Sequence, residues 1–269
     1  MDEMKHGQLV ASAAQIYEDF FVGSVFGSWA PLMLRAAAVS QGDTVLDVAC
    51  GTGVVAREAL PLVGQEGSVT GLDLNAEMLT IATAQAPAVR WENGPAEALP
   101  FPDNSFDRVL CQFGLMFFAD KAAALREMAR VLQPGGSLAV SVWDSLDKTP
   151  GYLRMAELVD HLFGAEMAAA FDFPFSLGDK TRLNELFAPL GLVEVQMQTM
   201  APEARFPTLD DWLFTEVRGW TLADKLDDAQ FAQLQTEAKS WLADFVQPDG
   251  TVRFPIPGHI VTGRKASAA

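Results

Sequence analysis

The sequence predicts an α/β protein built on a mostly parallel β-sheet with helices on both faces. Short β-branched and apolar runs alternate with helical segments between residues 41 and 145, and clusters of turn-forming residues separate them. Repeated strand–helix units of this length favour a parallel sheet, because each helix returns the chain to the edge where the next strand begins.

Within this region the strands are expected as short apolar runs at residues 44–50, 68–74, 89–93, 106–112 and 137–143. Helices are expected between them at residues 54–63, 76–85 and 121–132. Asn75 is a candidate N-cap for the second of these helices. The turn Gln133-Pro134-Gly135-Gly136 is expected to end the third helix.

Helical additions are expected on both sides of this region. Residues 8–38 show helical spacing with interleaved aromatic residues, and Pro31 suits the first turn of a second helical stretch. Further helices are expected at residues 152–170, 181–190, 210–220 and 228–245, and strands at 192–200 and 251–264, the last bent at its prolines. We interpret residues 1–269 as a single domain: a helical cap over 1–40, a core over 41–145, and a segment over 146–269 that completes the sheet and adds helices.

The composition argues against nucleic acid as a partner. The 269 residues include 19 lysines and arginines against 35 aspartates and glutamates, which gives a net charge of −16. A nucleic-acid-binding surface needs a basic stripe, and no cluster of lysine and arginine would serve as one. Nothing in the sequence distinguishes a monomer from a dimer.

The sequence also lacks signals for membranes and metals. No apolar run reaches the roughly 18 residues of a transmembrane helix, and the first ten residues lack the basic start and apolar stretch of a secretory signal, so a cytoplasmic protein is expected. The two cysteines, Cys50 and Cys111, and the three histidines, His6, His161 and His259, show no ligand spacing. We therefore expect neither a disulfide framework nor a metal site.

The most informative segment runs from Asp47 to Gly53 and joins a predicted strand to a predicted helix. Its glycines allow a sharp turn and the close approach of a ligand. Gly51-Thr52-Gly53-Val54-Val55-Ala56 also fits a dinucleotide fingerprint, and Asp73 lies 20 residues after Gly53, where an acid that binds ribose is expected. On these residues alone, the cofactor could be NAD or S-adenosylmethionine (SAM).

The charge of Asp47 favours SAM. NAD would place a pyrophosphate over the glycine turn, where a carboxylate would repel it. SAM has no phosphate but carries an ammonium and a sulfonium group, which Asp47 could face directly or through water. Asp47 is also expected to tighten the turn by accepting backbone hydrogen bonds.

An ordered series of motifs resembles the class I SAM-dependent methyltransferases, in particular the branch related to the quinone-biosynthesis methyltransferases. The matching segments are Val45 to Gly53, Gly71-Leu72-Asp73-Leu74-Asn75 with Met78, Ala96 to Phe101 followed by Ser105-Phe106-Asp107, and Glu127 to Gly136. They follow the family's order and spacing from about residue 40 to 143. The resemblance implies a Rossmann-like, seven-stranded sheet and a SAM-dependent methyltransferase activity.

The resemblance also implies a set of cofactor-binding residues. Gly51 and Gly53 would underlie the methionine part of SAM, and Asp73 would hold the ribose hydroxyls. Leu74 and Met78 would pack against the adenine, whose ring nitrogen would accept from the N–H of Ala96. The complete expected set is Tyr17, Asp47, Ala49, Gly51, Thr52, Gly53, Asp73, Leu74, Met78, Ala96, Glu97 and Gln112.

Tyr17, Gln112 and Glu97 have more specific expected roles. Tyr17 is expected to close over the methionine end, and Gln112, with Phe113, to lie beside the sulfonium and the acceptor. The family usually has an acid just before Ala96-Glu97, where this chain has Pro95, which has no carboxylate and no N–H. Glu97 either substitutes for that acid or is a solvated acid at the start of a helix.

Methyl transfer from a sulfonium is an in-line displacement, so alignment and exclusion of water are the main tasks of the protein. A dedicated base is needed only if the acceptor must lose a proton, and the sequence predicts no catalytic residue. The segment Cys111 to Phe118 replaces the Asn/Asp-Pro-Pro-aromatic segment of amide and exocyclic-amine methyltransferases. This favours a small-molecule acceptor that is methylated on oxygen, sulfur, carbon or an amine nitrogen.

The acceptor pocket is expected at the carboxyl ends of the strands. The residues expected to line it are Phe20, Phe26, Trp29, Phe113, Phe117 and Trp212, with Tyr152, Phe214 and Trp220 as further aromatic candidates. For each of them ordinary core packing is the alternative. The histidines are possible bases, but a solvated or core role is favoured for each. Two other functions remain open: an NAD-dependent oxidoreductase and a non-catalytic SAM-binding protein.

Overall fold

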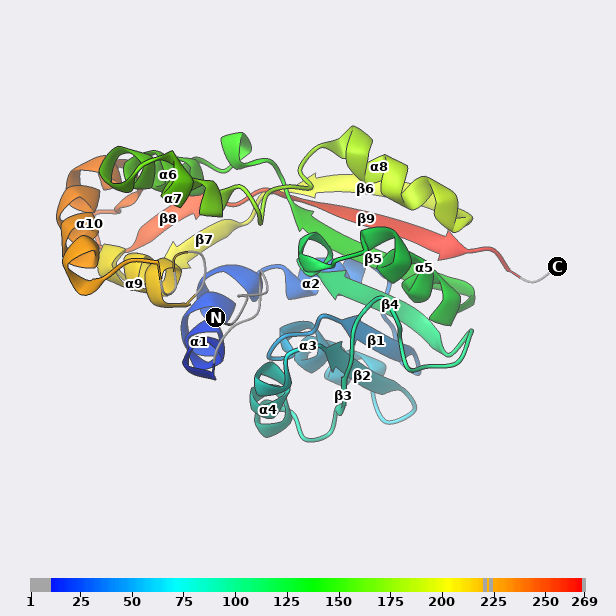
Figure 1. Ribbon diagram of the computed structural model, residues 1–269. Coiled ribbons are helices and arrows are strands. Elements are labelled where there is room, and N and C mark those ends of the chain that lie inside the picture. The colour runs from blue at the N-terminus through cyan, green and yellow to red at the C-terminus, as the bar shows by residue number, and fades with distance from the viewer. Residues whose placement is uncertain (1–10, 220–221, 223–224, 268–269) are drawn as a thin grey trace, which may run out of the picture.

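The computed structural model describes residues 11–219, 222 and 225–267 (Figure 1). Its main sheet has seven strands in the order β3-β2-β1-β4-β5-β9-β6. They are β1 (Thr44–Val48), β2 (Ser68–Asp73), β3 (Arg90–Asn93), β4 (Phe106–Gln112), β5 (Leu132–Trp143), β6 (Leu192–Met200) and β9 (Gly258–Lys265). Strands β1 to β5 are parallel, and β9 is antiparallel to both of its neighbours. The predicted seven-stranded, mostly parallel sheet is confirmed.

The helices between the strands cover both faces of this sheet. They are α3 (Val54–Val63), α4 (Ala76–Gln85) and α5 (Lys121–Val131). The chain moves in one direction across the sheet from β1 through α3 to β2, and in the other from β4 through α5 to β5. Because such crossovers are right-handed, α3 and α5 lie on opposite faces. Helix α2 (Ala30–Ala36) packs against α3, and α8 (Lys180–Phe187) packs against α5.

The local signals for these helices agree with the sequence. The Asn75 side chain accepts hydrogen bonds from the N–H groups of Glu77 and Met78 and so caps α4. Pro31 lies in the first turn of α2. Strand β5 begins earlier than expected, at Leu132, because Leu132 already pairs with Phe106 of β4. The expected turn, residues 133–136, lies in the irregularity before the next pair, Arg108 with Ser137.

The N-terminal part of the described chain is helical. Helix α1 (Ala11–Ile16) continues into a π-helical segment, Tyr17–Phe26, which leads to α2. This wider helix buries Phe21, Val25 and Phe26. The segment therefore packs aromatic side chains over the carboxyl edge of the main sheet.

The C-terminal half adds a second sheet that the sequence did not predict. Strands β7 (Glu203–Phe206) and β8 (Val252–Pro255) pair in antiparallel fashion. The predicted final strand over residues 251–264 is thus two strands, because Pro255 and Pro257 interrupt it: β8 joins the small sheet and β9 joins the main one.

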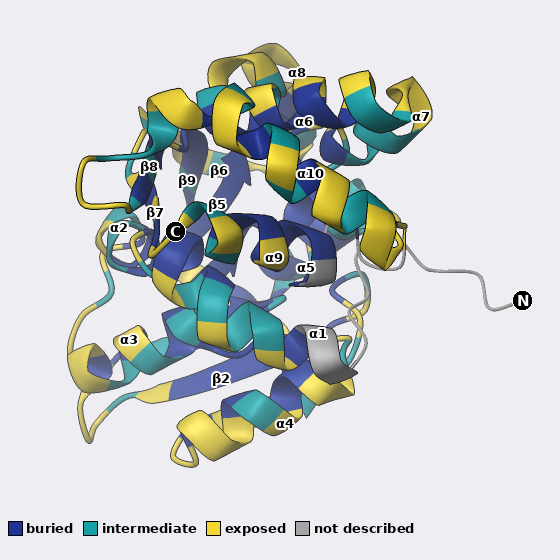
Figure 2. Cartoon of the chain, turned by 90° about the vertical axis from the view of Figure 1, so that its left-hand side faces the viewer, coloured by how far each residue is buried: buried dark blue, intermediate teal, exposed yellow. Residues whose placement is uncertain are grey.

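Helices gather around this second sheet (Figure 1). They are α6 (Pro150–Phe163), α7 (Ala165–Ala168), α9 (Leu209–Gly219) and α10 (Asp228–Trp241). Gly164 has a φ of +88° and separates α6 from α7, so the helix expected over residues 152–170 is broken there. The helices turn exposed residues outward and buried ones toward the sheets (Figure 2).

One hydrophobic cluster joins the two sheets. It includes Leu46 of β1, Val140 of β5, Trp212 of α9 and Phe254 of β8. All four side chains are buried almost completely. In the part of the chain that the structure describes, no helix is both long and apolar enough to cross a membrane.

Candidate functional site

A cavity of about 950 Å³ opens at the carboxyl ends of β1, β2 and β4. Strands β1 and β4 are neighbours at the point where the strand order reverses, which is where ligands bind in open α/β sheets. The lining comes from the π-helical segment, the turns after β1 and β2, the loop after β3, residues 112–121 after β4, and Phe173. Its exposed surface is mostly apolar.

The turn after β1 forms the floor of the cavity. Ala49 and Gly51 both line it, and both have left-handed backbone angles, with φ of 55° each. A left-handed alanine is strained and persists only where its surroundings fix it, as is common where a backbone contacts a ligand. The Gly51 N–H donates to the Asp73 carboxylate at 2.8 Å.

Gly53 and Thr52 do not line this cavity, although both were expected at the cofactor. A Cβ on Gly53 would lie 2.3 Å from the Trp91 ring, and a Cβ on Gly71 would lie equally close to it. Trp91, on β3, is fixed by a hydrogen bond from its indole N–H to the Ala86 carbonyl at 3.1 Å. Gly53 therefore lies in a tight helix–strand contact, and its φ of +85° also favours glycine. Trp91 was not among the residues expected at the site.

Asp47 lies behind the turn, not in the cavity. Its side chain is 1% exposed, and Oδ2 accepts from the Ala56 N–H at 3.1 Å, which ties the turn to α3 as expected. Its Oδ1 has no hydrogen-bond partner among the described residues. Burial raises the pKa of this carboxyl to about 8. Asp47 is not among the residues that line the cavity, so its expected contact with the cofactor, directly or through water, stays a prediction.

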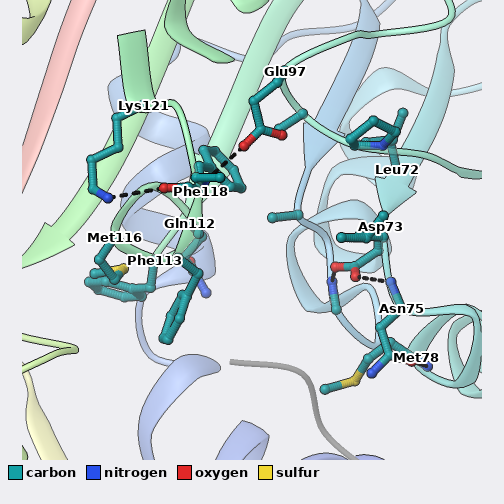
Figure 3. A pocket seen from close by; sticks show the side chains of 18 of the residues that line it. Leu72, Asp73, Asn75, Met78, Glu97, Gln112, Phe113, Met116, Phe118 and Lys121 are labelled. Atoms are coloured by element: carbon teal, nitrogen blue, oxygen red, sulfur yellow. Dashed lines mark hydrogen bonds between the residues drawn. The ribbon is translucent and has the colours of Figure 1, made fainter. Parts of the chain in front are cut away.

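Asp73, by contrast, lines the cavity at the end of β2 (Figure 3). Its Oδ2 accepts from Gly51, and its Oδ1 accepts from the Asn75 N–H at 2.8 Å. Burial raises its pKa, and these backbone donors counteract that effect. A carboxylate has about four acceptor positions, so the Asp73 side chain can still accept hydrogen bonds from a ligand. The carboxylate is thus held in one orientation at the cavity edge.

The expected adenine side is formed by Leu74, Met78, Pro95 and Ala96, which all line the cavity. Leu74 is 55% exposed, a large apolar surface at the cavity mouth. Such a surface is suited to a flat apolar ligand.

Glu97 also lines the cavity, within a turn and not at the start of a helix. Its Oε1 accepts from the N–H groups of Ala119 at 2.9 Å and Asp120 at 3.4 Å. The interpretation of Glu97 as a solvated helix-start acid is therefore wrong. The carboxylate connects the loop after β3 to the beginning of α5 across the upper edge of the cavity (Figure 3).

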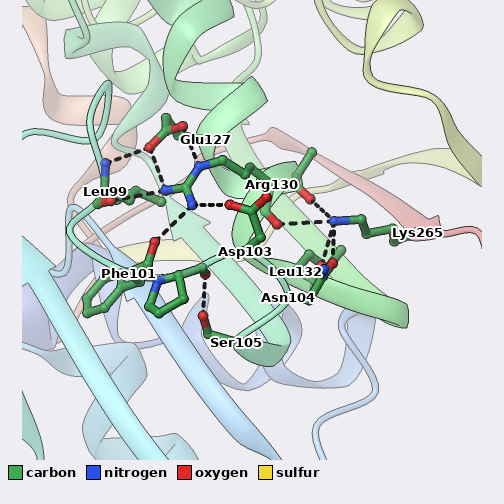
Figure 4. Close-up of polar contacts among 11 residues, drawn as sticks. Leu99, Phe101, Asp103, Asn104, Ser105, Glu127, Arg130, Leu132 and Lys265 are labelled. Carbon is green, nitrogen blue, oxygen red and sulfur yellow. Dashed lines mark hydrogen bonds and ion pairs between the residues drawn. The ribbon is translucent and has the colours of Figure 1, made fainter.

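A polar cluster on α5 holds the continuation of this loop (Figure 4). Glu127 accepts from the Leu99 N–H at 2.8 Å and pairs with Arg130 at 2.7 Å. Arg130 donates in turn to the carbonyls of Leu99 and Phe101 and to Asp103. The hydrogen bonds from Arg130 lower the pKa of Glu127. This cluster fixes the segment that follows Pro95 and Ala96.

Tyr17 lies over the glycine turn. A Cβ on Gly51 would be 3.7 Å from the Tyr17 ring, which stacks on Phe26 at a centroid distance of 5.0 Å. Glu18 forms a bidentate ion pair with Arg57 of α3 at 2.7 and 3.1 Å, which ties the π-helical segment to α3. Burial raises the pKa of Tyr17, and Asp73 raises it further. Tyr17 therefore carries a neutral hydroxyl.

The opposite end of the cavity is aromatic. Phe113 has a φ of 52° and stacks on Trp143 at 3.5 Å. Gln112 donates from its Nε2 to the Phe26 carbonyl at 3.2 Å. Phe117 packs against Phe173 at 5.4 Å. Of the lining residues here, the sequence did not single out Met116, Phe118, Lys121 or Phe173.

Other aromatic candidates lie elsewhere. Trp29 is fully buried behind Phe113, with its ring edge-on at 4.8 Å. Trp212 is fully buried against Phe254 of the second sheet at 4.6 Å. Phe20 packs against Phe214 at 5.7 Å, away from the cavity lining. These positions correct the expected acceptor wall, because aromatic spacing alone does not separate core side chains from cavity side chains.

The remaining candidates also lie away from the cavity or outside the described residues. Tyr152 is buried and packs against Phe175 and Phe254. His161 stacks on Trp241, and His259 is buried. Trp220 and His6 lie outside the residues that the structure describes. Within those residues, no group of three histidine, cysteine or acidic side chains could hold a metal ion.

The segment that contains the glycine turn and Asp73 matches a known protein family. Residues 45–136 match the family model described as a methyltransferase domain. The ubiquinone/menaquinone biosynthesis C-methyltransferase of Chromobacterium violaceum is 40% identical over 145 residues, which cover 51% of this chain and 59% of that protein. The 2-phytyl-1,4-naphtoquinone methyltransferase of Synechocystis sp. is 37% identical over 142 residues, with coverage of 49% and 60%. The aligned part of the chain thus spans less than two thirds of these relatives.

Solved structures share the fold over more of the chain. The YcgJ protein of Bacillus subtilis has a TM-score of 0.61 at 23% identity and covers 90% of this chain and 99% of its own. Phosphoethanolamine N-methyltransferase 2 of Haemonchus contortus has a TM-score of 0.64 at 18% identity, with coverage of 98% and 59%. Residues 45–136 therefore match the model of a methyltransferase domain, and about half of the chain is similar in sequence to quinone-biosynthesis methyltransferases.

Proposed function

We propose that this protein is a SAM-dependent methyltransferase that acts on a small-molecule acceptor. The observation that carries the proposal is the Asp73 carboxylate, which Gly51 and Asn75 hold at the edge of a large, mostly apolar cavity. A fixed carboxylate suits two vicinal ribose hydroxyls. The matching domain model and the relatives named as methyltransferases support the same activity.

The surroundings of the glycine turn disfavour NAD. A pyrophosphate would need free N–H groups at the start of α3 and open space over the glycines. The Ala56 N–H is already bound to Asp47, and the Trp91 ring covers Gly53. A cofactor without phosphate fits this arrangement better.

The residues of the cavity fit the parts of SAM. Asp73 would bind the ribose, Leu74 and Met78 would pack against the adenine, and Tyr17 would cover the methionine end. Gln112 and Phe113 would lie beside the reacting groups. SAM supplies an electrophilic methyl group on a sulfonium. The protein's contribution is to align the acceptor with that methyl and to exclude water through the aromatic wall.

A methyl-transfer assay tests this proposal. The protein would be incubated with SAM labelled on the methyl group and a panel of phenols, quinols, thiols, amines and carbon acids, and the products would be separated by mass. We expect the labelled methyl group in at least one acceptor. Quinols that can be methylated on a ring carbon are the first class to examine. Tight SAM binding without transfer to any acceptor would support a non-catalytic SAM-binding protein instead. Saturable NAD binding without SAM binding would support the oxidoreductase.

The Asp73→Asn variant tests the site itself. The amide replaces one acceptor oxygen by a donor, so SAM affinity should fall at least ~10-fold, as expected for lost hydrogen bonds to a charged group. Glu77→Gln, on the exposed first turn of α4, is the matched control and should leave the affinity unchanged. Unchanged SAM affinity in folded Asp73→Asn protein would contradict the ribose role.

A further inference from the structure

One cationic side chain stands at the aromatic end of the cavity. Lys121 lines the cavity together with Met116, Phe117 and Phe173 (Figure 3). Its Nζ donates to the Phe118 carbonyl at 3.0 Å, which uses one of its three donors. Burial lowers the pKa of this lysine. An ammonium among apolar side chains costs free energy unless a partner compensates it.

Two carboxylates line the cavity near Lys121, those of Glu97 and Asp120, and the negative charge of Glu97 raises the pKa of Lys121 in part. Both carboxylates accept hydrogen bonds from backbone N–H groups. Glu97 accepts from the backbone N–H groups of Ala119 and Asp120. Asp120 caps α5 by accepting from the Ala123 N–H at 2.8 Å. Among the described residues, Lys121 forms no ion pair with a carboxylate. Its two remaining donors are therefore available to a ligand in the cavity.

A second cationic side chain, that of Arg182, lies near Lys121. Arg182 lies on α8, which packs against α5, and its positive charge lowers the pKa of Lys121 further. The Arg182 side chain is exposed and forms no ion pair among the described residues. Neither cation forms an ion pair among the described residues, in a protein with a net charge of −16. The Lys121 ammonium therefore keeps donors with which it can bind an anionic group in the cavity.

We propose that the methyl acceptor is a planar, largely apolar molecule carrying a carboxylate or similar anionic oxygen group that binds Lys121. Its ring would pack against Phe117 and Phe173, and Arg182 would add attraction at longer range. This inference rests on the proposed methyltransferase function and narrows its substrate class. Lys121 would act in binding: it would anchor one end of the acceptor, so that the reacting end is directed toward Gln112 and Phe113.

Binding of matched acid–amide pairs tests the proposal. The probes are 2-naphthoate and 2-naphthamide, titrated by calorimetry into protein saturated with S-adenosylhomocysteine. The two probes share shape and ring surface, and only the acid carries a charge. We expect 2-naphthoate to bind the unmodified protein at least ~10-fold more tightly than 2-naphthamide.

Substitutions locate the preference. Lys121→Met keeps the length of the side chain but removes the charge, and it should abolish the preference for the acid. Lys121→Arg should retain most of it. Lys148→Met is the matched control, since Lys148 is exposed, pairs with Asp147 and lies outside the cavity lining, and it should leave the preference intact.

Four outcomes would overturn the proposal: equal affinity for the acid and the amide, no binding of either, a preference that survives in Lys121→Met, or loss of S-adenosylhomocysteine affinity in that variant, which would assign Lys121 to the cofactor. The failure of the unmodified protein to bind S-adenosylhomocysteine would instead contradict the proposed function. A separate titration of the cofactor product therefore distinguishes the two failures.

Discussion

Asp47 and Asp73 are two carboxylates on either side of one glycine turn, and their surroundings give them different properties. Asp73 accepts two backbone hydrogen bonds and lines the cavity, whereas Asp47 has one such bond and is sealed behind the turn. The pKa of Asp47, about 8, means that its carboxyl is mostly protonated at neutral pH. The same residue type thus lines the cavity at one position and stabilises a turn at the other.

The buried carboxyl of Asp47 predicts an unusual pH dependence of stability. Between its ordinary pKa of 3.8 and about 8, the unfolded chain releases this proton while the folded protein keeps it. Rising pH therefore favours unfolding, by at most about 1.4 kcal/mol per pH unit. The free energy of unfolding of the native protein, minus that of Asp47→Asn, should fall from pH 5.5 to 8 and level off above 8. Urea titrations across this range measure it.

The control for this prediction is Asp160→Asn, which replaces an exposed carboxyl on α6. The difference in the free energy of unfolding between the native protein and Asp160→Asn should change little between pH 5.5 and 8. A difference for Asp47→Asn that stays flat or increases with pH would mean that Asp47 is ionised in the folded protein.

Among single residues, the sequence predicted Asp73 because an acid at this spacing after a glycine turn has a specific use in cofactor binding. A strand-end acid 20 residues after a glycine turn identified Asp73 correctly as a cavity residue. The family resemblance assigned Gly53 to the cofactor as well, whereas the structure places it against Trp91, a tertiary contact that local sequence patterns do not contain. Lys121 gave no signal either, since a lysine in a first helical turn is usually solvated.

At the scale of elements, the second half of α5 supports the cavity from outside its lining. Its Glu127 and Arg130 hold the loop between β3 and β4 by four hydrogen bonds to the backbone and side chain of residues 99–103. Lys265 of β9 donates to the carbonyls of Ala129, Arg130 and Leu132 and so secures the end of the same helix. The loop that carries Pro95 and Ala96 is thereby tied to the core.

Removing the charge of Glu127 should loosen that loop. Glu127→Gln should lower the free energy of unfolding by about 1 kcal/mol, a modest value because the pair is partly exposed. It should also weaken SAM binding several-fold. Because the pKa of Glu127 is lowered in the folded protein, the stability difference should vanish as the pH falls below 4.5.

Glu157→Gln provides a matched control. Glu157 pairs with Arg154 at the same three-residue spacing on α6, but both side chains are nearly half exposed. Its loss should change stability by less than about 0.5 kcal/mol and leave SAM affinity unaltered. Equal effects of the two substitutions on SAM affinity would refute a role for α5 in positioning the loop.

Element boundaries followed the sequence closely where strands and helices alternate, and less well in the C-terminal half. The run from Thr251 to Arg264 has the composition of one strand, yet its two halves belong to different sheets. Strand β7 has only four residues with two charges, Glu203 and Arg205, so it lacks the apolar run that marks a strand. Its pairing with β8, more than 40 residues later, is a tertiary contact that local patterns do not contain.

At the scale of the whole molecule, the second sheet shares a hydrophobic core with the main one. The contact between α6 and β8 is among its closest: a Cβ on Gly151 would lie 2.5 Å from the Phe254 ring. Phe254 is itself buried and packs against Tyr152 and Trp212. The two sheets are therefore expected to unfold together.

Gly151→Ala should destabilise the protein. The added methyl overpacks this contact, which costs about 1–3 kcal/mol and outweighs the gain in helix propensity of about 1 kcal/mol. The melting temperature should fall in a single transition while SAM affinity is retained, because the cavity lies elsewhere. Gly23→Ala, where nothing lies within 4 Å of the new Cβ, should leave stability unchanged or raise it. If Gly151→Ala melted at the same temperature as Gly23→Ala or higher, the tight contact between Gly151 and Phe254 would be disproved.

A crystal structure with S-adenosylhomocysteine would show whether the cavity beside Asp73 holds SAM. We expect the ribose hydroxyls on the Asp73 carboxylate, the adenine against Leu74 and Met78, and the sulfur facing Gln112 and Phe113. A nucleoside bound elsewhere, or a ribose that does not touch Asp73, would contradict this placement of SAM.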